Sequence, residues 1–256
     1  AAHPQDKPVL CEKPFAMNAK ETKEMIDKAK EHNTFLMQAV WTIYFPAMRK
    51  LRTMLDEGVI GTITAVQGSF GFQAKDKPRL SQKELGAGAL LDVGIYLIAI
   101  SNWVFGEKPS TIKAMGELSE GGFDAQIGIL MSGYKNGGIA VLHTSFNAEI
   151  PRVFTIVGTT GRIVIDSFWC PTNFTLVTYG KSGNEVINTP YNFELPQKSG
   201  QQYNFFRSQG LQYEMKYVHE MLAQGKKESE LEPLHTTLGI METIDEIASQ
   251  IGLSYQ

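Results

Sequence analysis

The chain has 256 residues, of which 43% are hydrophobic and 20% charged, with a formal net charge of −3. These values are typical of a globular protein with one large or two ordinary domains, and they indicate neither a nucleic-acid partner nor a membrane surface. We also expect no membrane span, because no apolar run approaches the ~20 residues that a transmembrane helix needs. Cys11 and Cys170 have neither a disulfide nor a zinc spacing, and the histidines are dispersed, so we expect no metal site and a reducing, cytoplasmic setting.

The first expected element is a short apolar strand over 9–12, which must stop at Pro14 because proline cannot donate to a strand ladder. Lys13 precedes the proline and is therefore held in an extended conformation. A lysine at the carboxyl end of a buried strand faces the crevice where open α/β sheets bind ligands. The alternative interpretation is a solvated pair of Glu12 and Lys13 before a turn.

An amphipathic helix over 18–33 and an apolar strand over 35–41 follow. Asn18 and Glu21 have the spacing of a capping box at the start of that helix. A strand, a helix and a strand in this length predict a βαβ unit with parallel strands, the tail of a Rossmann-type sheet. The glycine-rich turn G-x-G-x-x-G that holds a pyrophosphate does not occur in the chain, and residues 1–8 contain no expected strand or helix.

Strands dominate the chain after a second helix, which is expected at 45–57. An alternating strand over 62–72 and a strongly apolar, buried helix over 88–105 precede a long run of strands. These strands are expected at 110–118, 126–134, 139–147, 153–157, 163–168 and 174–179, before a turn-rich stretch at 190–206 and amphipathic helices at 207–222 and 234–251. The order predicts an α/β plus α+β fold. Residues 1–43 would be the C-terminal remnant of a Rossmann-like parallel sheet, and residues 44–256 an α+β domain with a large, open, mostly antiparallel sheet.

Asp92 and Tyr96 are four residues apart in the apolar helix and therefore project from one face. One interpretation is structural, with both side chains bonded to backbone at the mouth of a buried helix. The other is proton transfer, because a carboxylate in an apolar helix is costly unless it is paired. A phenol with an ordinary pKa of about 10 works near neutral pH only beside a positive charge, which Lys13 would supply.

For two aromatic side chains, a structural and a functional interpretation are likewise both open. Trp41 follows a strand of the first unit and is either an interdomain core residue or part of a ligand cleft. Phe70 lies on the alternating strand with Phe72, where it either packs on the sheet face or forms an aromatic wall for a substrate ring.

Three ordered motifs carry a family resemblance, namely Glu12-Lys13-Pro14, the stretch from Gln38 to Ala47, and the stretch from Gly88 to Tyr96. Together they resemble the glucose-fructose oxidoreductase / inositol dehydrogenase (Gfo/Idh/MocA) family. The pattern is most similar to the branch of dimeric dihydrodiol dehydrogenases, which includes NADP-dependent D-xylose dehydrogenases. In this branch Trp41 is usually followed by Thr or Ser, Arg and Phe, so Ile43 and Tyr44 depart from the pattern. By resemblance, the first βα units of the nucleotide domain are absent from this chain.

The resemblance implies a role for each of these residues. Lys13, Asp92 and Tyr96 are the expected catalytic group, in which Tyr96 transfers the proton, Lys13 lowers the pKa of Tyr96, and Asp92 orients Lys13 or the substrate. Glu12, Lys13, Pro14 and Trp41 are expected to bind the cofactor, NADP or NAD, and Trp41, Phe70, Asp92 and Tyr96 the substrate. The resemblance also implies a cis peptide bond between Lys13 and Pro14.

The sequence therefore predicts an NAD(P)-dependent oxidoreductase that acts on the CH–OH group of a sugar or a trans-dihydrodiol. By resemblance, it would form a homodimer through its open sheet. The alternative is a non-catalytic fragment or homologue that serves as a dimerisation or ligand-binding module. Joint retention of Lys13, Asp92 and Tyr96 favours the enzyme, whereas the missing glycine-rich turn favours the alternative.

Overall fold

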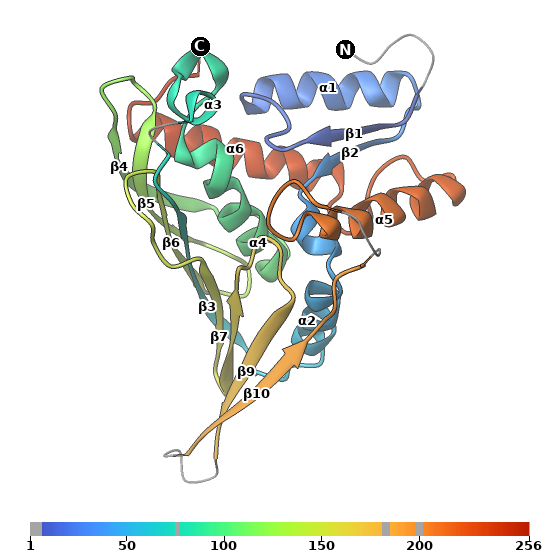
Figure 1. Ribbon diagram of the computed structural model, residues 1–256, viewed down its shortest axis with the longest axis vertical. Coiled ribbons are helices and arrows are strands. Elements are labelled where there is room, and N and C mark those ends of the chain that lie inside the picture. The colour runs from blue at the N-terminus through green and yellow to red at the C-terminus, as the bar shows by residue number, and fades with distance from the viewer. Residues whose placement is uncertain (1–6, 75–76, 181–184, 198–201, 256) are drawn as a thin grey trace.

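A computed structural model describes residues 7–74, 77–180, 185–197 and 202–255 (Figure 1). These residues form a small parallel sheet and a large mixed sheet with helices between and around them. Most of the stretch over 1–8, which we expected to lack a strand or helix, lies outside the described residues.

The small sheet confirms the expected βαβ unit. Strands β1 (Val9–Glu12) and β2 (Leu36–Ala39) pair in parallel, and helix α1 (Ala19–Glu31) connects them. The Asn18 side chain accepts a hydrogen bond from the Glu21 backbone N–H at 2.9 Å and so caps α1. Helices α1 and α6 (Leu234–Gln250) pack on one side of this unit, and α5 (Leu211–Ala223) packs on the other through Tyr217, Val218 and Met221. The small sheet is therefore covered by helices on both faces.

The connection to the rest of the chain is a buried 3-10 turn, η1 (Trp41–Tyr44), followed by α2 (Pro46–Asp56). Pro46 occupies the first helical turn, where its missing N–H costs nothing. The expected domain boundary between residues 43 and 44 falls inside η1 and stays a prediction.

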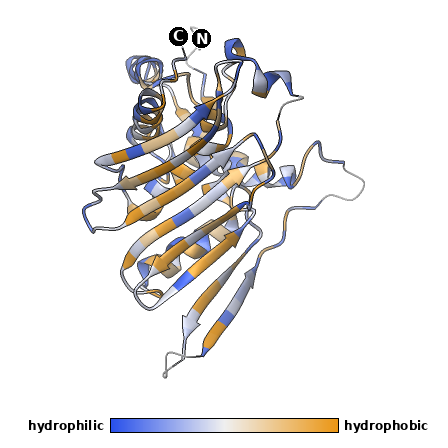
Figure 2. Ribbon diagram, turned by 90° about the vertical axis from the view of Figure 1, so that its left-hand side faces the viewer, coloured by the Kyte–Doolittle hydropathy of each residue, from blue (hydrophilic) through white to orange (hydrophobic). Residues whose placement is uncertain are grey.

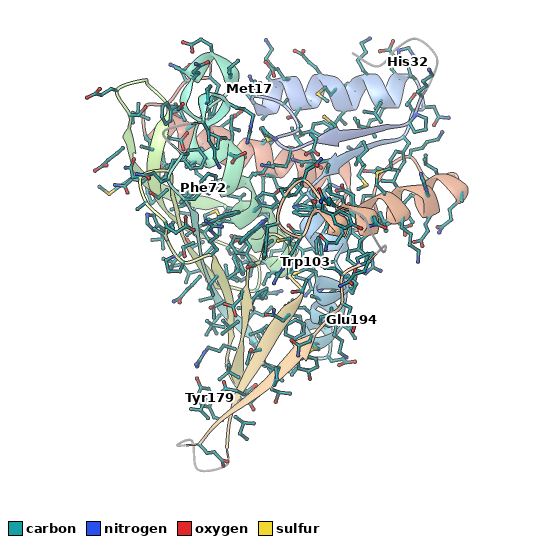
Figure 3. All side chains as sticks on the ribbon, in the orientation of Figure 1. Met17, His32, Phe72, Trp103, Tyr179 and Glu194 are labelled. Atoms are coloured by element: carbon teal, nitrogen blue, oxygen red, sulfur yellow. The ribbon has the colours of Figure 1, made fainter. Side chains whose placement is uncertain are left out.

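The large sheet has eight strands in the order β10-β9-β8-β7-β3-β6-β5-β4. Only the β3–β6 pair is parallel, so the expected open, mostly antiparallel sheet is confirmed. Its strands are β3 (Ile63–Gly71), β4 (Thr111–Leu118), β5 (Asp124–Ser132), β6 (Ile139–Ser145), β7 (Val153–Gly158), β8 (Gly161–Asp166), β9 (Asn173–Tyr179) and β10 (Val186–Asn192). Strand β10 was not predicted. In Figure 3, Tyr179 lies near the far tip of the β9–β10 pair, where its hydroxyl oxygen accepts a hydrogen bond from Arg162 at 2.7 Å.

One face of this sheet is covered and the other is open. Helix α4 (Ile95–Phe105) lies on the covered face, where a Cβ added to Gly68 would meet both Leu97 of α4 and Phe154 of β7 at under 3 Å. Figure 2 shows the other face, which no helix of the described residues crosses. Short helical segments complete the chain: α3 (Pro78–Ser81), η2 (Lys83–Leu85), η3 (Leu90–Gly94) and η4 (Ser208–Gly210).

The helical stretch over 83–105 is, among the described residues, long and apolar enough to cross a membrane, with a hydropathy of 1.6 over its most apolar window. The expectation that no apolar run approaches this length was therefore wrong. Of that window, 83% is buried inside the protein. A core helix of a globular protein passes the same test, and burial against the large sheet accounts for the apolar composition.

Candidate active site

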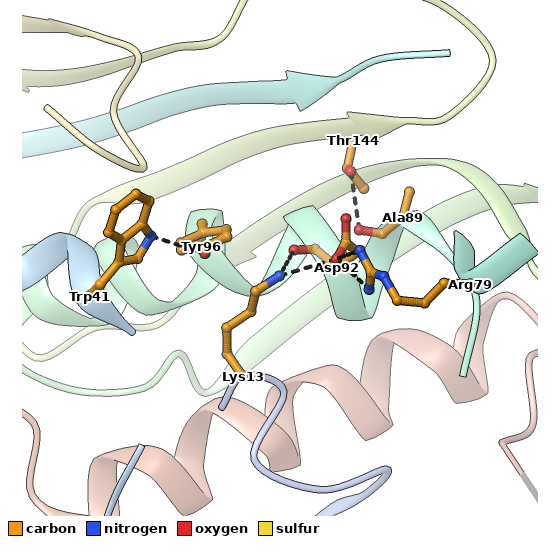
Figure 4. Close-up of polar contacts among 7 residues, drawn as sticks. All are labelled: Lys13, Trp41, Arg79, Ala89, Asp92, Tyr96 and Thr144. Atoms are coloured by element: carbon orange, nitrogen blue, oxygen red, sulfur yellow. Dashed lines mark hydrogen bonds and ion pairs between the residues drawn. The ribbon is translucent and has the colours of Figure 1, made fainter. Parts of the chain in front are cut away.

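Lys13 follows directly on β1, and its ammonium group reaches the helix that carries Asp92 (Figure 4). Nζ donates to the backbone carbonyl oxygen of Asp92 at 2.7 Å and to Oδ1 of its carboxylate at 3.1 Å. The two side chains are only 15% and 13% exposed, so the ion pair is largely removed from solvent. The Lys13–Pro14 peptide bond is cis, as the resemblance implied. Glu12, by contrast, is exposed at the end of β1.

Asp92 lies in η3, which is a π-helical turn that runs directly into α4. We expected a regular helix from residue 88, and π-turns are rare features that frequently occur at functional sites. Arg79 also donates to Asp92 Oδ1, from Nη1 at 3.2 Å and from Nη2 at 3.3 Å. Two cations thus face one carboxylate oxygen. Arg79 was missed from sequence, since nothing in the spacing of the short α3 points to Asp92.

Tyr96 lies at the start of α4, and its hydroxyl is held by Trp41 (Figure 4). The Trp41 indole N–H donates to the Tyr96 hydroxyl oxygen at 3.1 Å. Lys13 Nζ lies over the Tyr96 ring, 5.0 Å from its centroid. The structure therefore brings together Lys13, Trp41, Asp92 and Tyr96, four of the expected site residues, although Asp92 and Tyr96 share Lys13 rather than contacting each other directly.

The ionisation state of Tyr96 follows from its burial. Burial raises the pKa of Tyr96 well above its usual range, and the hydrogen bond from Trp41 is the main effect that lowers it. Loss of hydration has the largest effect on this pKa, and the expectation that Lys13 lowers it stays a prediction. The hydroxyl is protonated at neutral pH and is set up to donate its proton.

An aromatic wall lies next to Tyr96. The centroid of the Phe70 ring lies 6.1 Å from that of the Tyr96 ring. Phe70 also stacks on Trp169, with a centroid distance of 4.5 Å and an interplanar angle of 28°. Two exposed aromatic residues continue the wall, since Phe205 is 5.9 Å from Trp41 and Phe206 is 6.3 Å from Trp169. Phe70 was expected here. Trp169, Phe205 and Phe206 were missed because they come from loops far away in sequence.

A buried carboxyl supports the helix that carries the site. Oδ2 of Asp124, on β5, accepts a hydrogen bond from the backbone N–H of Leu90 at 2.6 Å, where η3 begins. Gly88 approaches closely with a φ of +135°, and a Cβ there would lie 1.9 Å from Asp124 Oδ1. Asp124 is fully buried, and burial raises its pKa from 3.8 to about 7. Asp124 therefore holds the start of the π-turn η3 against strand β5.

This raised pKa predicts a pH dependence of stability. Since the folded protein holds the Asp124 proton more tightly than the unfolded chain does, the stabilising contribution is complete below pH ~4 and is lost as the pH rises through about 7. We expect the free energy of unfolding of the wild type to fall over this range relative to Asp124→Asn, measured by urea unfolding. Asp166→Asn, at an exposed position, is the control. A difference between wild type and Asp124→Asn that does not change with pH would contradict the prediction.

Lys13 and Trp41 follow the carboxyl ends of β1 and β2, and this edge of an open α/β sheet is where dinucleotides bind. Two polar side chains of β2 and α5, Gln38 (1% exposed) and Glu214 (2% exposed), are buried. Both amide atoms of Gln38 and Oε1 of Glu214 lack hydrogen-bond partners. Buried polar atoms are normally paired, so these residues fit a polar ligand such as a nicotinamide dinucleotide. Over the described ranges, no group of three or more His, Cys, Asp or Glu side chains could hold a metal ion.

Comparison with known proteins decides the family. Residues 48–164 match the GFO/IDH/MocA C-terminal domain. A trans-1,2-dihydrobenzene-1,2-diol dehydrogenase from Xenopus laevis is 37% identical to the chain over 251 residues, which are 97% of this chain and 72% of the relative. The chain belongs to the Gfo/Idh/MocA family. The resemblance seen in the three sequence motifs is confirmed.

Solved structures agree with this Gfo/Idh/MocA fold. A levoglucosan dehydrogenase in complex with NADH and levoglucosan has a TM-score of 0.80 and 19% identity, covering 96% of this chain and 72% of that one. A 3-ketoreductase from Actinomadura kijaniata in complex with NADP and TDP-benzene has a TM-score of 0.77 and 19% identity, covering 95% and 71%. At this identity the likeness concerns the fold.

Proposed function

We propose that this Gfo/Idh/MocA protein is an NAD(P)-dependent oxidoreductase that acts on the CH–OH group of a trans-dihydrodiol or a sugar. The observation that carries the proposal is the convergence of Lys13, Asp92 and Tyr96 at the carboxyl end of β1. Similarity to dihydrodiol dehydrogenases supports the reaction class, and the NADH and NADP complexes of the structural neighbours support the cofactor.

The side chains divide the proton chemistry between them. A bound nicotinamide supplies the hydride chemistry, which no side chain can. In carbonyl reduction Tyr96 gives its hydroxyl proton to the substrate oxygen, and in alcohol oxidation the phenolate takes that proton back. Lys13 is placed to stabilise the phenolate, with its ammonium group 5.0 Å from the ring centroid. Asp92 holds Lys13 in position, and the Trp41 N–H fixes the Tyr96 oxygen.

The aromatic wall favours a ring-shaped substrate over a long or charged one. Trp169 and Phe206 offer apolar faces, with the buried Phe70 ring stacked on Trp169, while Asp92 and Tyr96 offer polar atoms for hydroxyl groups. Such a combination fits a cyclic trans-diol, and it also fits the pyranose ring of D-xylose, whose C–H faces pack on aromatic rings.

The test is a turnover assay that follows nicotinamide absorbance with NADP⁺ and NAD⁺. Substrates would be trans-dihydrobenzenediol, D-xylose, and inositol as an unrelated polyol. We expect turnover of the dihydrodiol or the pentose. The absence of both turnover and nucleotide binding would overturn the proposal.

The proposal includes a homodimer formed through the open face of the large sheet. One register row crosses all eight strands on this face: Lys113, Leu130, Val141, Gln67, Thr155, Val164, Thr175 and Pro190. Leu130 and Val141 are adjacent and exposed on this face, as is Met115 one pair away. The apolar pair Leu130 and Val141 is flanked by Lys113 on one side and Gln67 on the other, and an exposed apolar patch with a polar rim suits a face that packs against a second copy of itself.

We expect the double variant Leu130→Glu, Val141→Glu to be monomeric, because it would bury like charges against each other at the two-fold interface. Sedimentation velocity measures the change. Leu85→Glu, at an exposed leucine outside the sheet, is the matched control and should stay dimeric. A wild type that sediments as a monomer would contradict this part of the proposal.

The proposal also includes a cytoplasmic setting. Cys11 and Cys170 are both free thiols, which agrees with a reducing compartment. Cell fractionation with an antibody against the protein would test it, and recovery in an oxidising compartment would contradict it.

A further inference from the structure

Arg79 is a cation beside the site to which the proposed proton chemistry gives no role. Its Nη1 and Nη2 atoms both donate to Oδ1 of Asp92, at 3.2 and 3.3 Å, and Lys13 Nζ donates to the same oxygen at 3.1 Å (Figure 4). One cation is enough to neutralise one carboxylate, so the second ion pair calls for an explanation. The alternative to a function is an ordinary surface pair, because the Arg79 side chain is 71% exposed and such pairs contribute little to stability.

The backbone around Arg79 is anchored, which distinguishes this residue from a loose surface arginine. The next residue, Leu80, is 3% exposed and belongs to the hydrophobic core. On the other side, the Lys77 ammonium group lies over the Phe72 ring, 4.8 Å from its centroid. The centroid of the Phe72 ring lies 6.5 Å from that of Phe70 in the aromatic wall. Helix α3 is therefore held between the core and the aromatic wall, and the guanidinium group reaches Asp92 from a fixed base.

The contacts of the Asp92 carboxylate are all on one of its two oxygens. A carboxylate accepts about four hydrogen bonds, two at each oxygen. Oδ1 receives donors from Lys13 and Arg79, whereas no residue in the described part of the chain donates to Oδ2. The Asp92 side chain is nevertheless only 13% exposed. Oδ2 is therefore the acceptor that remains for a group from outside the protein.

Lys13 places this carboxylate next to the reacting group. Its ammonium group bonds to Asp92 and also lies 5.0 Å from the centroid of the Tyr96 ring. When the reacting oxygen of a substrate accepts the Tyr96 proton, a substituent on the neighbouring carbon can lie on the Asp92 side. A hydroxyl group at that position would donate to Oδ2.

We propose that Arg79 is a positioning residue that makes the site selective for vicinal diols, which carry a second hydroxyl on the carbon next to the reacting one. Together with Lys13, Arg79 occupies Oδ1 of Asp92 and so fixes the carboxylate with Oδ2 free to accept from that second hydroxyl. Arg79 acts through Asp92 and does not itself bind the substrate. This inference rests on the proposed function.

The experiment uses a complex in which no reaction occurs. The protein is saturated with NADPH or NADH, whichever it binds more tightly, and a reduced nucleotide cannot oxidise an alcohol. The dissociation constants of trans-cyclohexane-1,2-diol and cyclohexanol are then measured from the change in nicotinamide fluorescence. We expect the wild type to bind the diol at least about tenfold more tightly than cyclohexanol, which is the effect of one hydrogen bond to a charged group.

In Arg79→Met we expect binding of the diol to be about tenfold weaker and binding of cyclohexanol to be unchanged. In steady-state assays with the diol, the change should appear in KM and not in kcat, because the variant keeps Lys13 and Tyr96. Thermal unfolding should be nearly unchanged, since the Arg79 side chain is mostly exposed. A purely structural role would instead lower the stability and affect both ligands.

Three further variants separate positioning from other roles. Arg79→Lys keeps one donor and should bind the diol within about threefold of the wild type, because both Nη atoms bond to a single oxygen. In an Asp92→Asn background, Arg79→Met should cause no further weakening, because its effect passes through Asp92. Arg162→Met is the matched control: Arg162 donates to the Tyr179 hydroxyl, near the far tip of the large sheet, and its loss should leave both dissociation constants unchanged.

The failures are distinguishable. A wild type that binds no nicotinamide nucleotide at all overturns the proposed function. A wild type that binds the nucleotide but holds cyclohexanol as tightly as the diol overturns only the role of Arg79, as does an Arg79→Met variant that keeps its affinity for the diol or loses affinity for both ligands equally. If Arg79→Met still weakens diol binding in the Asp92→Asn background, Arg79 acts on the ligand by itself and the positioning role is wrong.

Discussion

Tyr96→Phe is expected to lower kcat by about 10²–10⁴-fold, the usual contribution of a positioned acid–base group. The change removes the hydroxyl that transfers the proton and leaves the ring packed beside Phe70 and under the Lys13 ammonium group. Nucleotide binding should be nearly unchanged, because the hydroxyl bonds to Trp41 within the protein and its proposed partner is the substrate oxygen. Steady-state turnover and a separate nucleotide titration measure the two quantities.

Tyr44→Phe is the matched control for this experiment. Tyr44 is also a buried tyrosine, but its hydroxyl bonds to Ser229 at 3.1 Å and lies apart from Lys13 and Asp92. We expect this variant to keep its turnover even if it loses some stability. If Tyr96→Phe turned over at the wild-type rate, Tyr96 would not be the proton donor.

Lys13→Met is expected to lower kcat by about 10²–10³-fold, as removal of one preorganised charge does in other active sites. Methionine keeps the unbranched stem but leaves no cation over the Tyr96 ring and no donor to the Asp92 carbonyl. A phenolate at Tyr96 would then lie in a buried site without its nearest positive charge. The loss should appear in kcat and should persist at saturating substrate.

Lys23→Met tests whether loss of any lysine has this effect. Lys23 forms a surface ion pair with Asp27 on α1, far from the site, and such pairs contribute little. Its removal should leave turnover unchanged. Equal activity of Lys13→Met and wild type would remove Lys13 from the catalytic group.

The sequence predicted those parts of the fold that depend on local pattern. Strand β1 stops before Pro14, α1 begins at the Asn18 cap, and the alternating strands pair in an open sheet, because periodicity and capping act over a few residues. Strand β10 escaped prediction because it is an exposed edge strand that contains Pro190, so neither burial nor alternation marks it.

From the sequence, only those site residues that belong to a recognisable motif could be predicted. Lys13, Asp92 and Tyr96 belong to motifs, whereas Arg79 and Trp169 reach the site only through the folding of distant segments. The pKa of Tyr96 could not be judged either, because the cost of burial depends on packing from every side. The sequence showed the nearby charge of Lys13 but not the loss of water, which has the largest effect on this pKa.

The π-turn at η3 has a consequence for the spacing of the chain. A π-turn holds one residue more than a regular helical turn, so deletion of one residue within Leu90–Gly94 would let the helix close normally. The residues before and after the turn would keep their relative directions, because a π-turn absorbs its extra residue locally, and only the residues inside the turn would change direction. Asp92 would turn away from Lys13 while Tyr96 kept its place against Trp41. Substitutions that keep the length of this segment are thus far more tolerable than a single deletion, which would separate the two halves of the site.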